Sequence, residues 1–178
     1  MKSNKLALSA FFIAFGIILP MIFHMAGGAG SVFLPMHLPV LLSGFWLGKR
    51  QGFLVGLLTP VLSSIFTGMP PLVPVLPLML AELSIYGFLA GYLYCDRGMR
   101  LLPALLLSMV GGRVGAGLAV WLLAVTLHVK LAPLSYLLGA VATGVPGILL
   151  QLLLLPVIVA RLQNMERYMA RSHAGEKA

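Results

Sequence analysis

The sequence predicts an all-α integral membrane protein with six transmembrane helices, and three observations lead to this class. Of the 178 residues, 60% are hydrophobic and only 9% are charged, whereas soluble domains carry about 25% charged residues. Apolar runs of roughly 20 residues, each long enough to cross the hydrocarbon core as a helix, recur along the whole chain. At about 30 residues per span and loop, the chain has room for six spans and no separate soluble domain.

The first two predicted spans differ in regularity. The first, over residues 6–25, is longer than the apolar core of a secretory signal, so we expect a retained helix. The second, over residues 34–47, is short and begins with Pro35 and Pro39, which remove two backbone donors and predict an irregular start. Irregular backbone at membrane depth is tolerated only against protein or a water-filled cavity.

The four remaining spans follow in order. The third, over residues 53–66, contains Pro60, where we expect a kink. The fourth, fifth and sixth spans are separated by short polar loops and cover residues 75–94, 101–127 and 133–162.

Lysine and arginine predict the orientation. Ten of the twelve lie at the chain ends or in the second and fourth loops, whereas Lys130 lies on the other side. Because cytoplasmic loops are enriched in these residues, we expect both termini in the cytoplasm. The same pattern accounts for the net charge of +8 without a nucleic-acid partner. The chain thus divides into a transmembrane domain, residues 1–162, and a basic cytoplasmic tail, residues 163–178, which we expect to be frayed.

Glu82 and Arg113 are the two charged residues that fall well inside predicted spans. A charge at the centre of a membrane helix costs about 2.5–3.5 kcal/mol. One interpretation is a structural ion pair that joins the fourth and fifth spans. The other is a ligand site, in which the planar guanidinium of Arg113 holds an anionic or carbonyl group and Glu82 orients it or accepts from ligand hydroxyls. Both interpretations can hold if the ion pair between Glu82 and Arg113 opens when a ligand binds.

Other residues extend this candidate site. Tyr86 lies one helical turn from Glu82, and His37, between two prolines, is the histidine we expect to contact a ligand. The sixth span carries small and polar residues at a spacing of four, which must face other helices or a pocket rather than lipid. This stripe comprises Gly139, Thr143, Gly147 and Gln151.

A second stripe runs along the third span and comprises Gly52, Gly56, Thr59, Ser63 and Thr67. Its hydroxyl groups either face a pocket or donate to carbonyls of their own helix. We expect the bond to the same helix for the neighbouring Ser64.

Ala10 and Ala14 form a small-xxx-small patch on the otherwise bulky first span. Such a patch either packs against a neighbouring span or provides a docking face for a separate membrane protein.

Recognisable catalytic and metal-binding patterns are absent from the sequence. It contains no HExxH, GxSxG or GxxxxGK[ST] motif, and no histidines or carboxylates spaced as metal ligands. The single Cys95 excludes a disulfide framework and a multi-cysteine metal site. We therefore predict neither an enzyme, nor a metal, nor a cofactor.

Four stretches carry a resemblance to a known family: residues 36–45 (MHLPVLLSGF), 52–60 (GFLVGLLTP), 68–71 (GMPP) and 82–87 (ELSIYG). With its size, six spans and short second span, the chain resembles the substrate-binding S components of energy-coupling factor (ECF) vitamin transporters. The resemblance covers nearly the whole length and is greatest to the group that includes pantothenate- and folate-type members.

The resemblance implies high-affinity binding of a vitamin or vitamin precursor from the outer side of a prokaryotic cell membrane. It implies a pocket built largely from the last three spans, a region that overlaps with Glu82, Tyr86, Arg113 and Gln151. It further implies that Ala10 and Ala14 match the family's AxxxA motif, which docks to a transmembrane coupling subunit. Two cytoplasmic ATPases would drive import, because the S component hydrolyses no ATP itself.

The nature of the ligand follows from Arg113, which suggests an anion, with pantothenate as the first candidate. Flavin, thiamin-like, lipoate and other precursor ligands stay open. The alternative from another class is a structural or assembly membrane protein, in which Glu82 and Arg113 form a buried pair and no small molecule binds.

Overall fold

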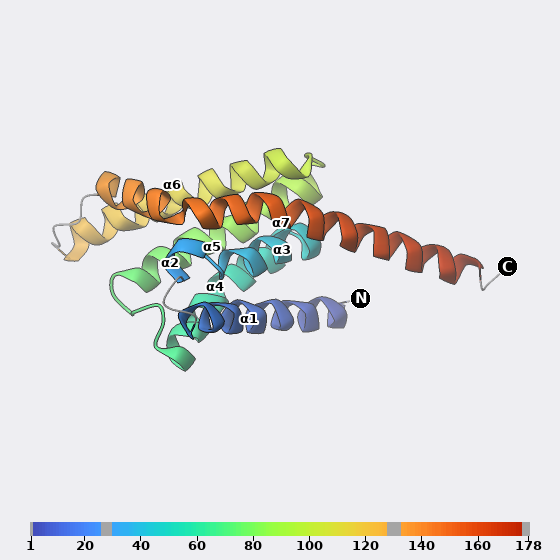
Figure 1. Cartoon of the computed structure of the whole chain (residues 1–178), viewed down its shortest axis with the longest axis horizontal. Helices are drawn as coiled ribbons and strands as arrows, with labels where there is room; N and C mark the ends of the chain where they lie inside the picture. The colour runs from blue at the N-terminus through green and yellow to red at the C-terminus, as the bar shows by residue number, and fades with distance from the viewer. Residues whose placement is uncertain (1, 26–29, 128–132, 176–178) are drawn as a thin grey trace.

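The computed structural model describes residues 2–25, 30–127 and 133–175, and within them all regular structure is helical (Figure 1). The elements are α1 (Lys2–Met25), α2 (Gly30–Phe33), α3 (His37–Leu47), α4 (Lys49–Thr67), α5 (Val75–Gly91), the π-helical turn η1 (Tyr92–Asp96), α6 (Leu101–Leu127) and α7 (Pro133–Gly175).

The predicted class, an all-α integral membrane protein, is confirmed. Each predicted span coincides with one of the helices α1, α3, α4, α5 with η1, α6 and α7. Four apolar stretches of the described residues are long enough to cross a membrane: Asn4–Phe23, Val75–Asp96, Leu101–Thr126 and Leu138–Leu162. The short second span is α3, with 11 residues.

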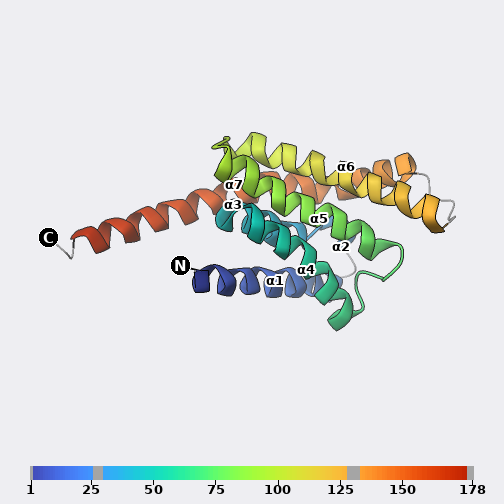
Figure 2. The same cartoon turned by 180° about the vertical axis from the view of Figure 1, so that it is seen from behind.

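The helices α1, α3, α4, α5, α6 and α7 run in alternating directions, so α1 begins at the same end of the bundle from which α7 projects (Figures 1 and 2). The start of α1, the α3–α4 turn, the η1–α6 turn and the end of α7 lie at one end of the bundle, which we call the basic end after Lys5, Lys49, Arg50, Arg97 and Arg100. The bundle is layered, with α1 on one side, α6 on the other, and α3, α4 and α5 between them.

The irregular start of the second span is confirmed, and prolines explain it. Leu34 has a positive φ of 49°, and its carbonyl accepts a hydrogen bond from the His37 amide at 3.1 Å. Pro39 is the third residue of α3, where the missing amide hydrogen would have no acceptor within the helix. The helix ends at Gly48, whose φ of 95° allows the tight turn into α4.

Glycines bring the backbones of α4 and α5 into direct contact. A Cβ atom added at Gly52 would collide with the backbone of Gly87, and one at Gly56 would collide with the carbonyl of Leu83. The small-residue stripe of the third predicted span is therefore a helix-packing face over its first half. The buried core beside this contact includes Leu41, Val55, Leu83, Ala90, Leu105 and Leu155.

Two features differ from the expectations. The short helix α2 precedes the second span and was not predicted. The tail expected to be frayed is helical up to Gly175 as a continuation of α7, and it projects beyond the bundle (Figure 1). Between Pro156 and Gly175 the sequence has neither proline nor glycine and is rich in residues that favour helix, which accounts for the extension.

Candidate functional site

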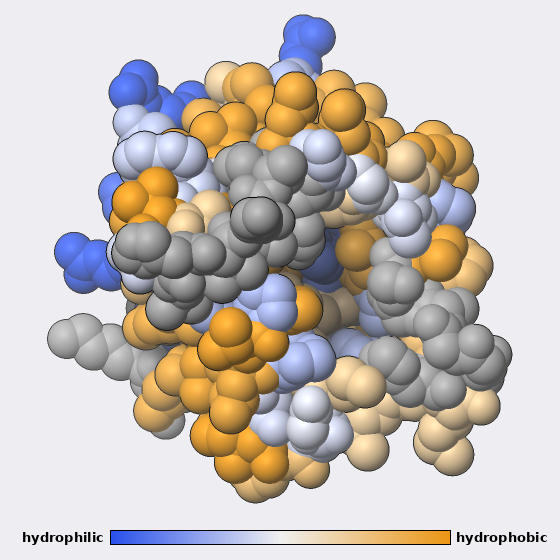
Figure 3. Space-filling view, turned by 90° about the vertical axis from the view of Figure 1, so that its left-hand side faces the viewer, coloured by the Kyte–Doolittle hydropathy of each residue, from blue (hydrophilic) through white to orange (hydrophobic). Residues whose placement is uncertain are grey.

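A cavity of about 870 Å³ lies at the end of the bundle opposite to the basic end. Figure 3 looks onto this end and shows the surface hollowed near its centre. The volume falls in the range typical of small-molecule sites, about 300–1,000 Å³. Most of the wall is apolar and is supplied by prolines, by Leu34 and by five methionines, namely Met21, Met25, Met36, Met69 and Met79.

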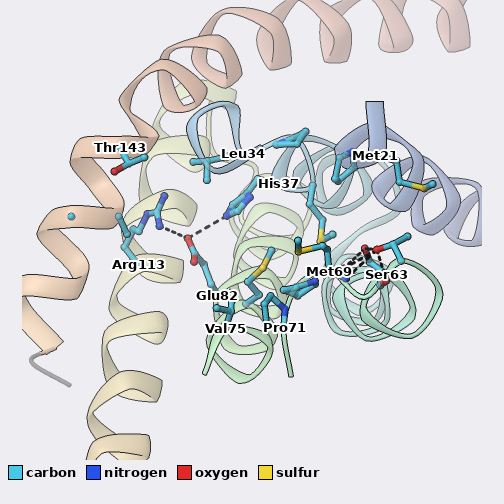
Figure 4. A pocket seen from close by; sticks show the side chains of 18 of the residues that line it. Met21, Leu34, His37, Ser63, Met69, Pro71, Val75, Glu82, Arg113 and Thr143 are labelled. Atoms are coloured by element: carbon cyan, nitrogen blue, oxygen red, sulfur yellow. Dashed lines mark hydrogen bonds and ion pairs between the residues drawn. The ribbon is translucent and has the colours of Figure 1, made fainter. Parts of the chain in front are cut away.

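Three ionisable side chains from three helices meet at the inner wall of this cavity (Figure 4). Glu82 of α5 accepts a hydrogen bond at Oε1 from Nη1 of Arg113 on α6, at 2.9 Å. The same oxygen lies 3.3 Å from Nε2 of His37 on α3. Glu82 is 6% and His37 3% exposed, so these two side chains are almost wholly removed from solvent, whereas the Arg113 side chain is 15% exposed. The predicted pair between the fourth and fifth spans therefore exists, and it borders a cavity.

Arg113 and His37 keep unused hydrogen-bonding capacity. Nε and Nη2 of Arg113, and Nδ1 of His37, are buried and have no hydrogen-bond partner in the described part of the chain. A guanidinium carries five donor hydrogens, and the pair with Glu82 engages one edge only. Since a buried donor without an acceptor costs about 1–3 kcal/mol, these groups favour a ligand that presents hydrogen-bond acceptors to Arg113.

Tyr86 and Gln151 do not line the cavity, although both are fully buried. The Tyr86 ring packs edge-on against the His37 ring, with centroids 5.2 Å apart. Nε2 of Gln151 lies 3.5 Å from the carbonyl of Leu34, across the space between α7 and the start of the second span. The structure thus places both residues behind side chains that line the cavity.

Thr143 is exposed and lines the cavity beside Arg113 (Figure 4). The rest of its stripe on α7 divides between two roles. Gly139 also lines the cavity, whereas Gly147 is closed off by the backbone of Phe33, which would collide with an added Cβ. The first part of the stripe therefore faces the cavity, and the later part faces the short helix α2. The contact between α7 and α2 places Leu34, which follows α2, at the cavity wall.

The hydroxyl groups of α4 hold the segment that follows the helix. Thr59 donates to the carbonyl of Val55 in its own helix at 2.6 Å, one of the two expected outcomes. Ser63, which lines the cavity, donates to the carbonyl of Met69 at 2.7 Å. The expectation for Ser64 is wrong, because Ser64 donates to the carbonyl of Pro70 at 2.8 Å. Gly68, with φ 71°, turns the chain back over the last turn of α4 and makes these bonds available.

The alanine patch on α1 faces outward. Ala10 and Ala14 are exposed, while Phe12 and Gly16 on the opposite face are buried against the bundle. An added Cβ at Gly16 would meet the γ-methyl of Thr59. Packing within the described chain therefore uses the other face of α1, and the patch is accessible.

Sequence reasoning missed the apolar wall of the cavity. Leu34, Met21 and Met79 carry no signal in the sequence, because methionine and leucine are common throughout an apolar chain. Among the described residues, no group of three or more His, Cys, Asp or Glu side chains could hold a metal ion.

Apolar membrane helices that enclose a cavity of ligand size, with a partly buried arginine at its wall, are typical of a membrane-embedded protein that binds small molecules. A family model for the substrate-specific component of ECF transporters matches residues 4–159. The chain belongs to this family, whose members are substrate-binding subunits of importers and not enzymes. No curated protein and no solved structure matches the chain at a significant level.

Proposed function

We propose that this S component binds an anionic vitamin or vitamin precursor with high affinity, and that pantothenate is the first compound to test. The observation that carries the proposal is Arg113, which lines a cavity of about 870 Å³ and has two buried nitrogens without an acceptor among the described residues. A carboxylate matches a guanidinium edge with two parallel hydrogen bonds.

The remainder of the wall supports a ligand with an apolar portion. Met21 and Met69 line the side of the cavity away from Arg113 (Figure 4), and Met79 also lines the cavity. Methionine side chains are flexible and polarisable, so they adapt to ligands of irregular shape. A carboxylate at Arg113 with an apolar body against the methionines would use both parts of the wall. Flavin, thiamin-like and lipoate compounds are the alternative ligands, and their binding is to be measured beside that of pantothenate.

Partners and location complete the proposal. The exposed patch of Ala10 and Ala14 on α1 supports docking to the transmembrane coupling subunit of the transporter. Two cytoplasmic ATPases would supply the energy. The basic residues at one end of the bundle support a cytoplasmic position for both termini, which turns the cavity toward the outside of a prokaryotic cell membrane.

The competing function, a structural or assembly protein without a ligand, is favoured by one observation, the 2.9 Å pair between Arg113 and Glu82. Mass spectrometry of protein purified in mild detergent separates the two. A vitamin retained at near-equimolar amount, with calorimetry confirming its rebinding, is the expected result. Protein that carries no small molecule and binds no member of a vitamin panel would support the structural role instead.

A further inference from the structure

A second hollow, of about 490 Å³, lies at the basic end, far along the bundle from the ligand cavity. Three separate parts of the chain build it: the start of α1, the turn between α3 and α4, and η1. We call it the basic hollow and define it by Lys5, Trp46, Lys49, Arg50 and Asp96. It shares no lining residue with the ligand cavity.

The basic hollow has an excess of positive charge. Lys49 pairs with Asp96, which is the single acidic residue among those that line the hollow. Lys5 contacts the carbonyl of Leu47 at 3.5 Å. Neither Lys5 nor Arg50 has a carboxylate partner among the residues that the structure describes. Two cations of the hollow are therefore available to an anion.

An apolar stripe continues from the hollow along α4. Phe53 and Leu54 follow Arg50 by three and four residues, so they lie on its face of the helix. They are 40% and 49% exposed, and Leu58, one turn further, is 40% exposed. This face thus presents a cation at the membrane boundary and then about 8 Å of apolar surface, from Phe53 to Leu58, toward the membrane interior. Trp46, half-buried in the hollow, has the amphipathic ring that favours the headgroup level.

We propose that the basic hollow binds an anionic phospholipid. The phosphate lies between Lys5 and Arg50, and an acyl chain lies along Phe53, Leu54 and Leu58. Basic pockets between membrane helices on the cytoplasmic side have the charge and position that such headgroups require. A soluble anion or an acidic protein segment would use the two cations but would have no use for the apolar stripe, which is why the lipid is the favoured occupant.

Native mass spectrometry of the full chain in a non-ionic detergent tests the proposal. Phosphatidylglycerol and phosphatidylcholine with identical acyl chains are added in equal amounts. We expect at least fivefold more phosphatidylglycerol adduct, and loss of that preference in the variant with both Lys5→Gln and Arg50→Gln. The control variant, with Arg100→Gln and Arg161→Gln, removes two exposed basic residues outside the hollow and should keep the preference.

Three results would overturn the proposal. Equal retention of the two lipids would show that the headgroup charge is not recognised. An equal effect of the two double variants would show diffuse charge attraction rather than a site. Displacement of the lipid by glycerol 3-phosphate or hexaglutamate as efficiently as by added phosphatidylglycerol would identify a soluble anion or an acidic segment as the occupant. Vitamin binding is measured in parallel and does not enter any of these outcomes.

Discussion

Nη1 of Arg113 lies 2.9 Å from Oε1 of Glu82, while Nη2 and Nε of the same guanidinium have no partner in the described chain. One nitrogen of the guanidinium therefore binds Glu82, and the other two bind no group of the described chain. A purely structural pair would leave the other two nitrogens without an acceptor in the described chain. This asymmetry is the reason that the structural and ligand-binding interpretations of the pair coexist.

Arg113→Ala should weaken binding of the retained vitamin at least tenfold, which corresponds to about 1.4 kcal/mol. The variant also leaves Glu82 buried without its cation, which destabilises proteins by about 3–5 kcal/mol. The double variant Arg113→Ala with Glu82→Gln removes both charges, so we expect it to fold well and still bind weakly. Calorimetry measures the affinity, and an unchanged affinity in either folded variant would refute the role of Arg113.

Ala10→Leu combined with Ala14→Leu should block assembly with the coupling subunit and leave vitamin affinity unchanged. The leucine side chains would enlarge an exposed face of α1 that the described chain does not use for its own packing. Co-purification with a tagged coupling subunit reports assembly. Ala142→Leu, at an exposed alanine of α7, is the control and should assemble normally. Normal assembly of the α1 variant would remove the support for docking at this patch.

Gly87→Ala should destabilise the fold, because the added methyl group would overlap the backbone of Gly52. Overpacking of this kind costs about 1–3 kcal/mol, which lowers the Tm of a chain of this size by several degrees. Thermal unfolding in detergent gives the measurement. Gly139→Ala, at a position where no atom lies within 4 Å of the added Cβ, should leave the Tm equal or slightly higher. A similar Tm for both variants would contradict the close packing of α4 on α5.

Cysteine labelling tests the orientation. In a Cys95→Ser background, Lys49→Cys should be protected from a membrane-impermeant maleimide on intact cells, and Lys130→Cys should react. Lys49 lies at the basic end, whereas Lys130 lies outside the described residues and is placed by the sequence alone. The opposite labelling pattern would reverse the orientation that the positive-inside rule predicts.

The fold was predictable because its signals are local. Apolar runs between polar loops defined the six spans, and Pro35 and Pro39 predicted the irregular start of α3. Glu82, Arg113 and His37, which meet at the cavity wall, were predictable as candidates because polar groups are rare and costly in an apolar chain. The extension of α7 to Gly175 was missed because a polar, basic segment after the last span gives no packing signal, although its helix propensity is high.

The depth of individual residues in the site was not predictable. Thr143 and Gln151 share one stripe on α7, yet Thr143 lines the cavity and Gln151 is buried against the Leu34 carbonyl. The periodicity identifies a helix face but not where along that face a pocket ends. Ser64 differed from expectation because its partner, the Pro70 carbonyl, is placed by the turn at Gly68, which the rule for hydroxyls in helices does not consider.

Backbone contact at Gly52 and Gly87 leaves no layer of side chains on which α4 and α5 could slide, so the two helices behave as one rigid unit that carries Glu82. Gly147 packs against the backbone of Phe33 in the same manner and joins α7 to α2. This second unit carries Thr143 and Phe33, the residue that precedes Leu34. The two units supply opposing walls of the cavity of about 870 Å³. A cross-link between α5 and α7 would therefore hold these two walls at a fixed separation.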